Sequence, residues 1–148
     1  MGSPAHRASN DCKTERGFLK IVIVKKIYWK EKKLMENEVK NFYKDFMQAT
    51  QKMAPAIPET VKQFMCLVEG TLKPGALDTK QKEFIALGIA VAQHCVPCIY
   101  LHVQKSVLAG ATRQEIMEAA SVAVFMGGGP AFTHIMEVVK ALDALDAA

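Results

Sequence analysis

The sequence predicts an all-α protein of about six helices joined by short turns, and three observations support this prediction. From Met35 onward, apolar residues recur at spacings of three and four, the period of an amphipathic helix. Two patterns typical of helix N-termini occur, Asp78 followed by Gln81 and Thr112 followed by Glu115. Prolines and glycines divide the chain into helix-sized segments, and no convincing alternating strand pattern follows Met35. We therefore expect a helical bundle.

Length and composition are ordinary for one globular domain. The chain has 148 residues, of which 50% are hydrophobic and 23% charged, which excludes collagen-like and wholly disordered proteins. No stretch approaches the roughly 18 uninterrupted apolar residues that a membrane span needs. Residues 1–29 lack the small-residue cleavage site of a secretory signal. We expect a cytoplasmic protein that does not associate with a membrane.

The net charge of +4 is unevenly distributed along the chain. Residues 1–34 contain nine basic and three acidic residues, whereas residues 35–148 contain ten basic and twelve acidic ones. The chain thus divides into a basic N-terminal extension, residues 1–34, and a helical domain, residues 35–148. Because no aromatic platform or helix-turn-helix pattern accompanies the lysines, we expect no nucleic-acid partner.

The N-terminal extension allows several interpretations. Residues 1–17 are small and polar, without a hydrophobic period. Residues 18–29 (FLKIVIVKKIYW) form a β-branched run broken by lysines, which fits a short strand, an added helix or a docking arm. The whole extension could also precede the functional protein, for example through an upstream start site.

Prolines and glycines set the predicted helix ends. A residue before proline avoids the helical region, so we expect breaks at residues 54–55 and 57–58. Gly110 suits the position just after a helix, and residues 126–130 (MGGGP) break the segment that follows. The third helix is apolar almost all round, so we expect it to be central and buried. The predicted helices span residues 36–53, 58–73, 79–94, 97–109, 113–125 and 131–145.

The residues best suited to chemistry are Cys95, Cys98 and His102, at the expected start of the fourth helix. Two cysteines three residues apart can close a disulfide there with little backbone movement. The positive end of the helix dipole and its free N–H groups stabilise a thiolate. His102 lies one turn after Cys98 on the same face, where an imidazole can accept the thiol proton or pair with the thiolate. The pattern predicts a reactive dithiol.

Metal binding is the alternative for a C-x-x-C pair. Together with His94 and His102 the pair would supply candidate ligands, but no second C-x-x-C completes a tetrahedral zinc shell. We expect no metal and no cofactor. The other two cysteines are isolated: Cys66 has apolar neighbours and is expected to be a core thiol, and Cys12 lies in the extension.

One signature resembles a known family. Glu83, eleven residues, then Cys95-x-x-Cys98-x-x-x-His102 is similar to the E-x11-C-x2-C-x3-H signature of the alkylhydroperoxidase D-like proteins, in the carboxymuconolactone decarboxylase superfamily. Residues 122–142 also resemble that superfamily's glycine-rich break and closing helix. The resemblance covers about residues 35–142 and implies an all-helical bundle that assembles into homotrimers or homohexamers.

The resemblance also implies an antioxidant activity. Members of the family are thiol peroxidases that reduce hydroperoxides and receive electrons from a dithiol partner, such as a lipoyl- or thioredoxin-like protein. By this resemblance Cys98 is the peroxidatic nucleophile, Cys95 resolves its sulfenic acid into a disulfide, and Glu83 and His102 relay protons. No metal or flavin is required for this chemistry.

Pro97 departs from the family pattern, because peroxidase members commonly have a second histidine at this position. The resulting C-x-P-C sequence resembles the thioredoxin active-site loop, which favours thiol–disulfide exchange as the working activity. His94 could replace the absent histidine or be a solvated or capping residue. His134, after the glycine break, could line the site or lie at an interface or on the surface.

The position of Glu83 raises a geometric question. If residues 83–95 form one straight helix, they span about 18 Å at the usual helical rise, so Glu83 cannot touch the cysteines of its own chain. We expect it to serve the cysteines of a neighbouring subunit. The alternatives are a bend at Gly88 and a structural role in the first turn of the helix.

Two other functions compete with a thiol oxidoreductase. One is a carboxymuconolactone decarboxylase, a lyase of aromatic degradation, although that chemistry does not need a C-x-x-C pair. The other is a non-catalytic oligomeric or metal-binding module.

Overall fold

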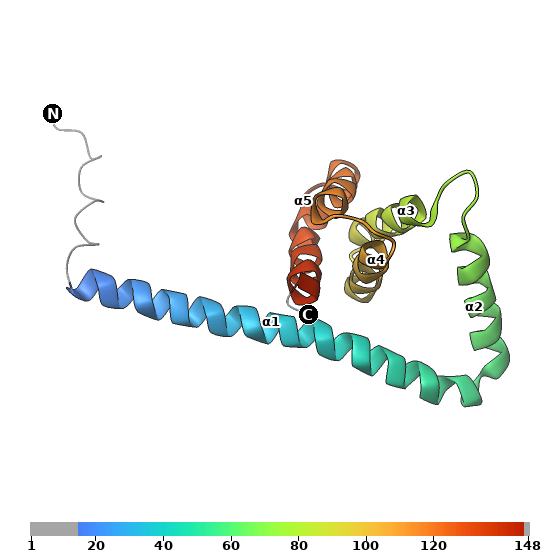
Figure 1. Ribbon diagram of the computed structural model, residues 1–148, viewed down its shortest axis with the longest axis horizontal. Coiled ribbons are helices and arrows are strands. Elements are labelled where there is room, and N and C mark those ends of the chain that lie inside the picture. Colours follow the sequence, from blue (N-terminus) through green and yellow to red (C-terminus); the bar gives the residue numbers. More distant parts are fainter. Residues whose placement is uncertain (1–14, 147–148) are drawn as a thin grey trace. The chain divides into compact units, whose positions relative to one another are not determined.

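A computed structural model describes residues 15–146, with side chains described from residue 37 onward and at a few earlier positions. The described residues form helices and no strand, which confirms the all-α prediction (Figure 1). The segment after Thr112 is broken at Gly128, within the predicted glycine break. The helices are α1 (Glu15–Ala56), α2 (Pro58–Leu72), α3 (Thr79–Ala92), α4 (Val96–Leu108) and α5 (Arg113–Asp146).

The chain divides into two compact units, Met1–Met35 and Glu36–Ala148. In the first unit the described backbone is helical from Glu15, so residues 18–29 do not form a strand. The expected helix start after Met35 is wrong, because α1 runs through this point. No proline or glycine interrupts residues 18–54, and so nothing in the sequence forces the helix to stop.

A proline sets the boundary between α1 and α2. Ile57 leaves the helical region, with φ −137°, and Pro58 occupies the first position of α2 as predicted. The break expected at residues 54–55 is wrong, because Pro55 lies inside the last turn of α1. A proline near a helix end keeps a helical φ and removes a single N–H, so the helix continues to Ala56.

Both predicted capping boxes are present. The Asp78 carboxylate accepts from the backbone N–H of Gln81 at 2.7 Å, and the Gln81 side chain accepts from the Asp78 N–H at 2.9 Å. Thr112 and Glu115 make the corresponding pair at the start of α5. The backbone hydrogen bond from Thr112 and the side-chain hydrogen bond from Lys80 lower the pKa of Glu115 to about 2. These bonds fix where α3 and α5 begin.

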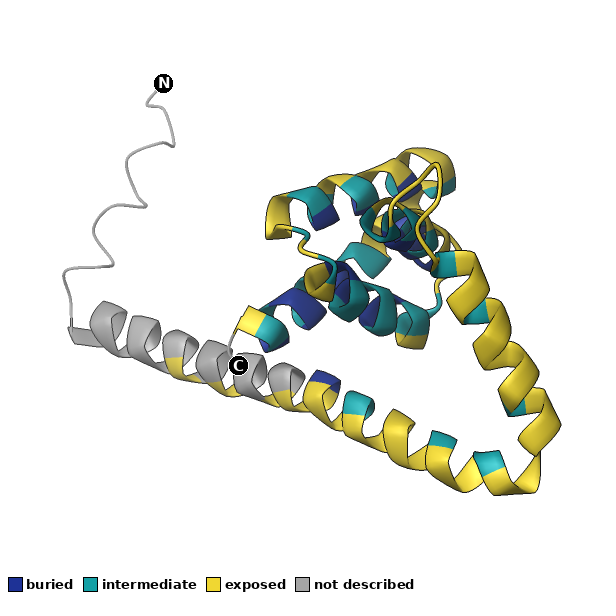
Figure 2. Ribbon diagram, turned by 45° about the vertical axis from the view of Figure 1, so that its right-hand side comes forward, coloured by how far each residue is buried: buried dark blue, intermediate teal, exposed yellow. Residues whose placement is uncertain are grey.

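The core of the second unit lies among α3, α4 and α5, where the buried residues in Figure 2 concentrate. The face of α3 that carries Leu87 and Val91 is buried, whereas Ile85 and Ile89 are about half exposed. The predicted third helix, α3, is therefore buried on one face only. No residue of α2 is buried, and Cys66 on this helix is an exposed free thiol. The prediction of Cys66 as a core thiol is wrong, because its apolar neighbours are also exposed within the single chain.

Among the described residues, α5 is the one helix whose length and composition would allow it to cross a membrane. This helix is broken at Gly128 and packs against α3 and α4. An apolar core helix passes the same test of length and composition.

Replacing Gly128 with alanine is expected to destabilise the protein by about 1–3 kcal/mol. Gly128 has φ 64° and ψ −150°, a conformation that is essentially confined to glycine. Gly70, in α2, is the matched control, because a Cβ there meets open space at an ordinary φ and alanine should be neutral or slightly stabilising. Urea unfolding of the two variants measures the difference. Equal stability of the two would contradict the assigned strain.

Candidate active site

Cys95 and Cys98 form a disulfide at the N-terminus of α4, as the sequence analysis allowed. Their Cα atoms lie 5.2 Å apart, within the roughly 4.4–6.8 Å that disulfides span. Cys95 is the residue preceding the helix and Pro97 lies in its first turn, where a missing N–H costs nothing. Both cysteines are half-buried, so the dithiol lies at the edge of the core with access to solvent.

A tight turn directly before the disulfide reverses the chain between α3 and α4. His94 has φ 57°, in the left-handed region that few non-glycine residues adopt. The Cys95 N–H donates to the Ala90 carbonyl at 3.0 Å and the His94 N–H to the Val91 carbonyl at 3.1 Å. As a result α4 folds back along α3, and the two helices pack against each other.

This reversal brings Glu83 and His102 together within one chain. The Glu83 Oε2 lies 2.7 Å from the His102 Nδ1. The Glu83 side chain is 2% exposed and that of His102 is 23% exposed. This arrangement is compatible with Glu83 lying far from the cysteines along α3. It is not compatible with the expectation that Glu83 serves a neighbouring subunit, because its partner is His102 of the same chain.

The carboxylate orients the imidazole. A carboxylate at Nδ1 holds the proton on that nitrogen and leaves Nε2 free to accept another. It also stabilises the imidazolium that forms when the ring takes a proton. His102 follows Cys98 by four residues within α4, the spacing at which two side chains share one face of a helix.

A pair of imidazoles involves the turn itself. The rings of His94 and His134 are stacked, with centroids 4.6 Å apart and planes 26° from parallel. The His134 Nδ1 donates to the Pro130 carbonyl at 2.9 Å. The sequence left the role of each histidine open, and gave no indication that they meet.

Tyr100 and Glu137 join α4 to the part of α5 after Gly128, and no sequence pattern singled out either residue. The Tyr100 hydroxyl donates to the Glu137 Oε2 at 2.6 Å, and Lys140 donates to the other carboxylate oxygen at 2.9 Å. Burial and the hydrogen bond to Glu137 raise the pKa of Tyr100. Tyr43 of α1 donates to the Tyr100 carbonyl at 2.8 Å, and burial raises its pKa to about 12. No local pattern reveals contacts between residues so far apart in the chain.

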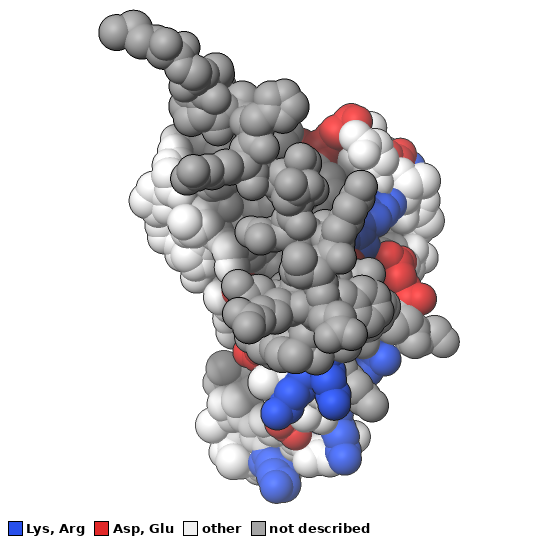
Figure 3. Space-filling model, turned by 90° about the vertical axis from the view of Figure 1, so that its left-hand side faces the viewer, with Lys and Arg blue, Asp and Glu red and all other residues white. Residues whose placement is uncertain are grey.

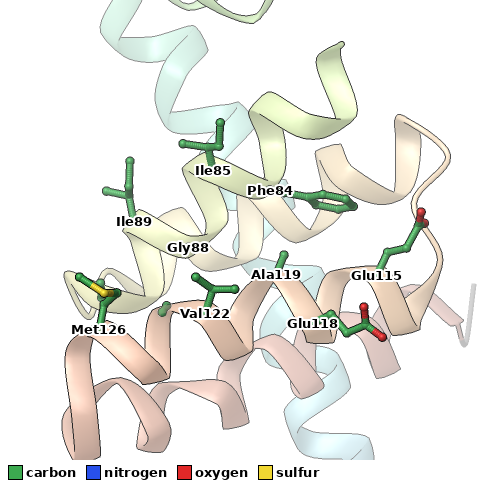
Figure 4. A pocket seen from close by; sticks show the side chains of 11 residues that line it. Phe84, Ile85, Gly88, Ile89, Glu115, Glu118, Ala119, Val122 and Met126 are labelled. Carbon is green, nitrogen blue, oxygen red and sulfur yellow. The ribbon is translucent and has the colours of Figure 1, made fainter. Parts of the chain in front are cut away.

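An apolar groove of about 700 Å³ lies between α3 and α5 (Figure 4). Phe84 and Ile89 line it from α3, and Val122 and Met126 line it from α5. The lining of the groove does not include the cysteines, His102 or Glu83. The groove is therefore separate from the dithiol.

The described residues contain no group of three or more His, Cys, Asp or Glu side chains arranged to hold a metal ion. Cys12, in the extension, lies outside the described part of the chain.

On the face shown in Figure 3, basic side chains gather toward the lower end, and acidic side chains lie among and above them.

Comparisons with known proteins place these features in a family. The family model of the carboxymuconolactone decarboxylase family matches residues 58–141. A relative from Paracoccus denitrificans, an uncharacterized protein of the cox locus, is 38% identical over 85 residues, which are 57% of this chain and 77% of the relative. An uncharacterized protein of Cupriavidus necator is 28% identical over 95 residues, 64% of this chain and 84% of the relative.

Two solved structures are also similar. The apo structure of a carboxymuconolactone decarboxylase family protein from Legionella pneumophila has 38% sequence identity and a TM-score of 0.66, covering 74% of this chain and 96% of that one. A family protein from Thermotoga maritima, for which involvement in an antioxidative response is suggested, has 29% identity and a TM-score of 0.63, covering 70% and 91%. By its family match, its identity to these proteins and its fold, the chain belongs to the carboxymuconolactone decarboxylase family.

Proposed function

We propose that this protein is a thiol oxidoreductase of the alkylhydroperoxidase D-like type, which uses Cys95 and Cys98 to reduce hydroperoxides or disulfides. The observation that carries the proposal is the Cys95–Cys98 disulfide at the start of α4, with His102 one turn after Cys98 in the helix and bound to the buried Glu83. The suggested antioxidative involvement of the similar Thermotoga maritima protein supports the same class of chemistry.

The peroxide reaction would proceed in two steps. His102 accepts the proton of the Cys98 thiol, and the thiolate attacks the peroxide O–O bond, giving a Cys98 sulfenic acid and an alcohol. Cys95 then attacks the sulfenic sulfur, which forms the disulfide and releases water. Glu83 stabilises the charged imidazole in the first step, and an external dithiol returns the pair to the reduced state.

The proposal includes partners and an assembly. The electron donor is a dithiol of the lipoyl- or thioredoxin-like class, and the protein acts in the cytoplasm as a homotrimer or homohexamer. Exposed apolar side chains support assembly, because isolated chains seldom leave so many in contact with water. They include Ile85, Ile89, Phe125, Met126, Phe132 and Met136.

Intact-mass spectrometry after addition of one equivalent of an organic hydroperoxide tests the proposal. Cys12→Ser and Cys66→Ser are introduced first, because the exposed Cys66 thiol would also react. In this background the reduced protein should lose two hydrogens, as the Cys95–Cys98 disulfide forms. The further change Cys95→Ser should stop the reaction at a Cys98 sulfenic acid that dimedone traps, and Cys98→Ser should give neither product.

Free thiols at both positions after peroxide treatment would rule out the peroxidase activity. If a disulfide substrate also failed to oxidise the pair, the oxidoreductase proposal would be wrong. Conversion of carboxymuconolactone by a variant with both cysteines replaced by serine would then assign the lyase activity for which the family is named.

A further inference from the structure

The disulfide lies between two contacts to the part of α5 after Gly128, one made by the turn before α4 and one by α4 itself. The first contact is the His94–His134 ring stack, just before the disulfide, and the second is the Tyr100–Glu137 hydrogen bond, just after it. The two contacts follow the same order along both segments. Along the chain, residues 95–98 therefore lie between two points that contact the part of α5 carrying His134 and Glu137.

The stacked imidazoles are held in defined positions. Because the Pro130 carbonyl accepts a hydrogen bond from the His134 Nδ1, the proton of a neutral His134 ring is on that nitrogen and Nε2 has a free lone pair. His94 keeps its left-handed backbone through the hydrogen bond to Val91. A non-glycine residue in this conformation is uncommon, and such strain concentrates at functional sites.

The charged groups around the pair are also defined. Glu137 lies one turn after His134, and it is bound by Tyr100 from α4 and by Lys140 from its own helix. Burial raises the pKa of the Glu137 carboxyl, but the hydrogen bonds from Tyr100 and Lys140 and the positive charge of Lys140 outweigh it and hold that pKa below its usual value. An ionised carboxylate therefore accompanies the imidazole pair.

We propose that the His94–His134 pair is the proton donor and acceptor for Cys95, as His102 is for Cys98. This proposal rests on the oxidoreductase function proposed above. When a donor thiolate attacks the Cys98 sulfur, the electron pair of the broken S–S bond goes to Cys95, and the imidazole pair protonates the departing thiolate. In the oxidising direction the pair takes the Cys95 proton as Cys95 attacks the Cys98 sulfenic acid. Each cysteine then has an imidazole as its proton donor and acceptor, although Pro97 occupies the position at which peroxidase members of the family commonly have a second histidine.

The test measures the reactivity of Cys95 alone, in the full chain with Cys12→Ser, Cys66→Ser and Cys98→Ser. The rate of alkylation by iodoacetamide is followed from pH 5 to pH 10, with and without His94→Asn and His134→Asn. Asparagine is chosen at position 94 because it tolerates a left-handed backbone. Loss of the imidazoles should raise the midpoint of the profile by about one pH unit and slow alkylation below it about tenfold.

The reciprocal measurement uses Cys98 alone, with Cys95→Ser in place of Cys98→Ser. Here His102→Asn should slow alkylation, and the His94→Asn, His134→Asn pair should leave the profile unchanged. If the double variant does not fold, His134→Asn alone carries the test, since it leaves the turn at His94 intact. A Cys95 profile that does not respond to loss of either imidazole would overturn the proposal.

This readout does not depend on turnover of peroxide. If the Cys95 profile shifts as expected in a protein that peroxide does not oxidise, the role proposed for the imidazole pair is supported and the proposed peroxidase activity is wrong. If peroxide oxidises the protein normally but the Cys95 profile does not shift, the peroxidase activity is supported and the role proposed for the imidazole pair is wrong.

Discussion

Replacing His102 with leucine is expected to destabilise the protein by about 3–5 kcal/mol, because the change leaves a buried carboxylate without its partner. Glu83 is 2% exposed, and His102 is the one side chain seen to bind it within the described residues. An isolated charge in this environment loses its hydration and gains nothing in return. The loss should appear in urea unfolding followed by circular dichroism, with every variant measured at the same protein concentration.

A double variant separates the loss of the polar interaction from the loss of packing. Glu83→Leu together with His102→Leu replaces both polar groups with apolar side chains, which is often neutral or stabilising for buried ion pairs. We therefore expect the double variant to recover most of the stability lost by His102→Leu. If the two variants are equally unstable, the pair contributes through packing and the electrostatic interpretation is wrong.

Replacing His102 with asparagine is expected to slow the reaction of Cys98 with hydroperoxide by about 10²–10⁴-fold, the range that a positioned general base contributes. Asparagine can still hydrogen-bond to Glu83, so the fold is perturbed less than by leucine, but it cannot accept the thiol proton. Single-turnover stopped-flow measurements at neutral pH, with the resulting disulfide verified by mass, determine the rate constant.

Glu83→Gln should reduce the same rate less than His102→Asn does, because Glu83 acts through the imidazole. Lys105→Gln is the matched control: it lies later on the same helix and takes no part in the site. A wild-type rate for His102→Asn would contradict the general-base role of His102. The helix dipole would then be the main source of thiolate stabilisation.

Features that depend on neighbouring residues were predictable from the sequence. The capping boxes at Asp78 and Thr112 each involve side chains three residues apart, and Pro58 and Gly110 act on the backbone at their own positions. The Cys95–Cys98 disulfide belongs to the same group, since a single helical turn brings the two residues within bonding distance. Local geometry thus gave the all-α class, most helix ends and the place of the dithiol.

Local rules were also the source of the errors. Pro55 was expected to end a helix that in fact continues for one more residue, and Cys66 was assigned to the core from its apolar neighbours alone. Burial of a side chain depends on what packs against its helix. No residue of α2 is buried by the described part of the chain, and a sequence pattern cannot show this.

The sequence by itself determined the candidate residues of the site: the cysteine pair, its position at a helix N-terminus, and a histidine one turn away. The tertiary structure alone decided their partners. The turn at His94 folds α4 back along α3 and so joins Glu83 to His102. The packing of α4 against the second half of α5 joins His94 to His134. These contacts link side chains 19 and 40 positions apart, and such distances close only when whole helices pack around a common core.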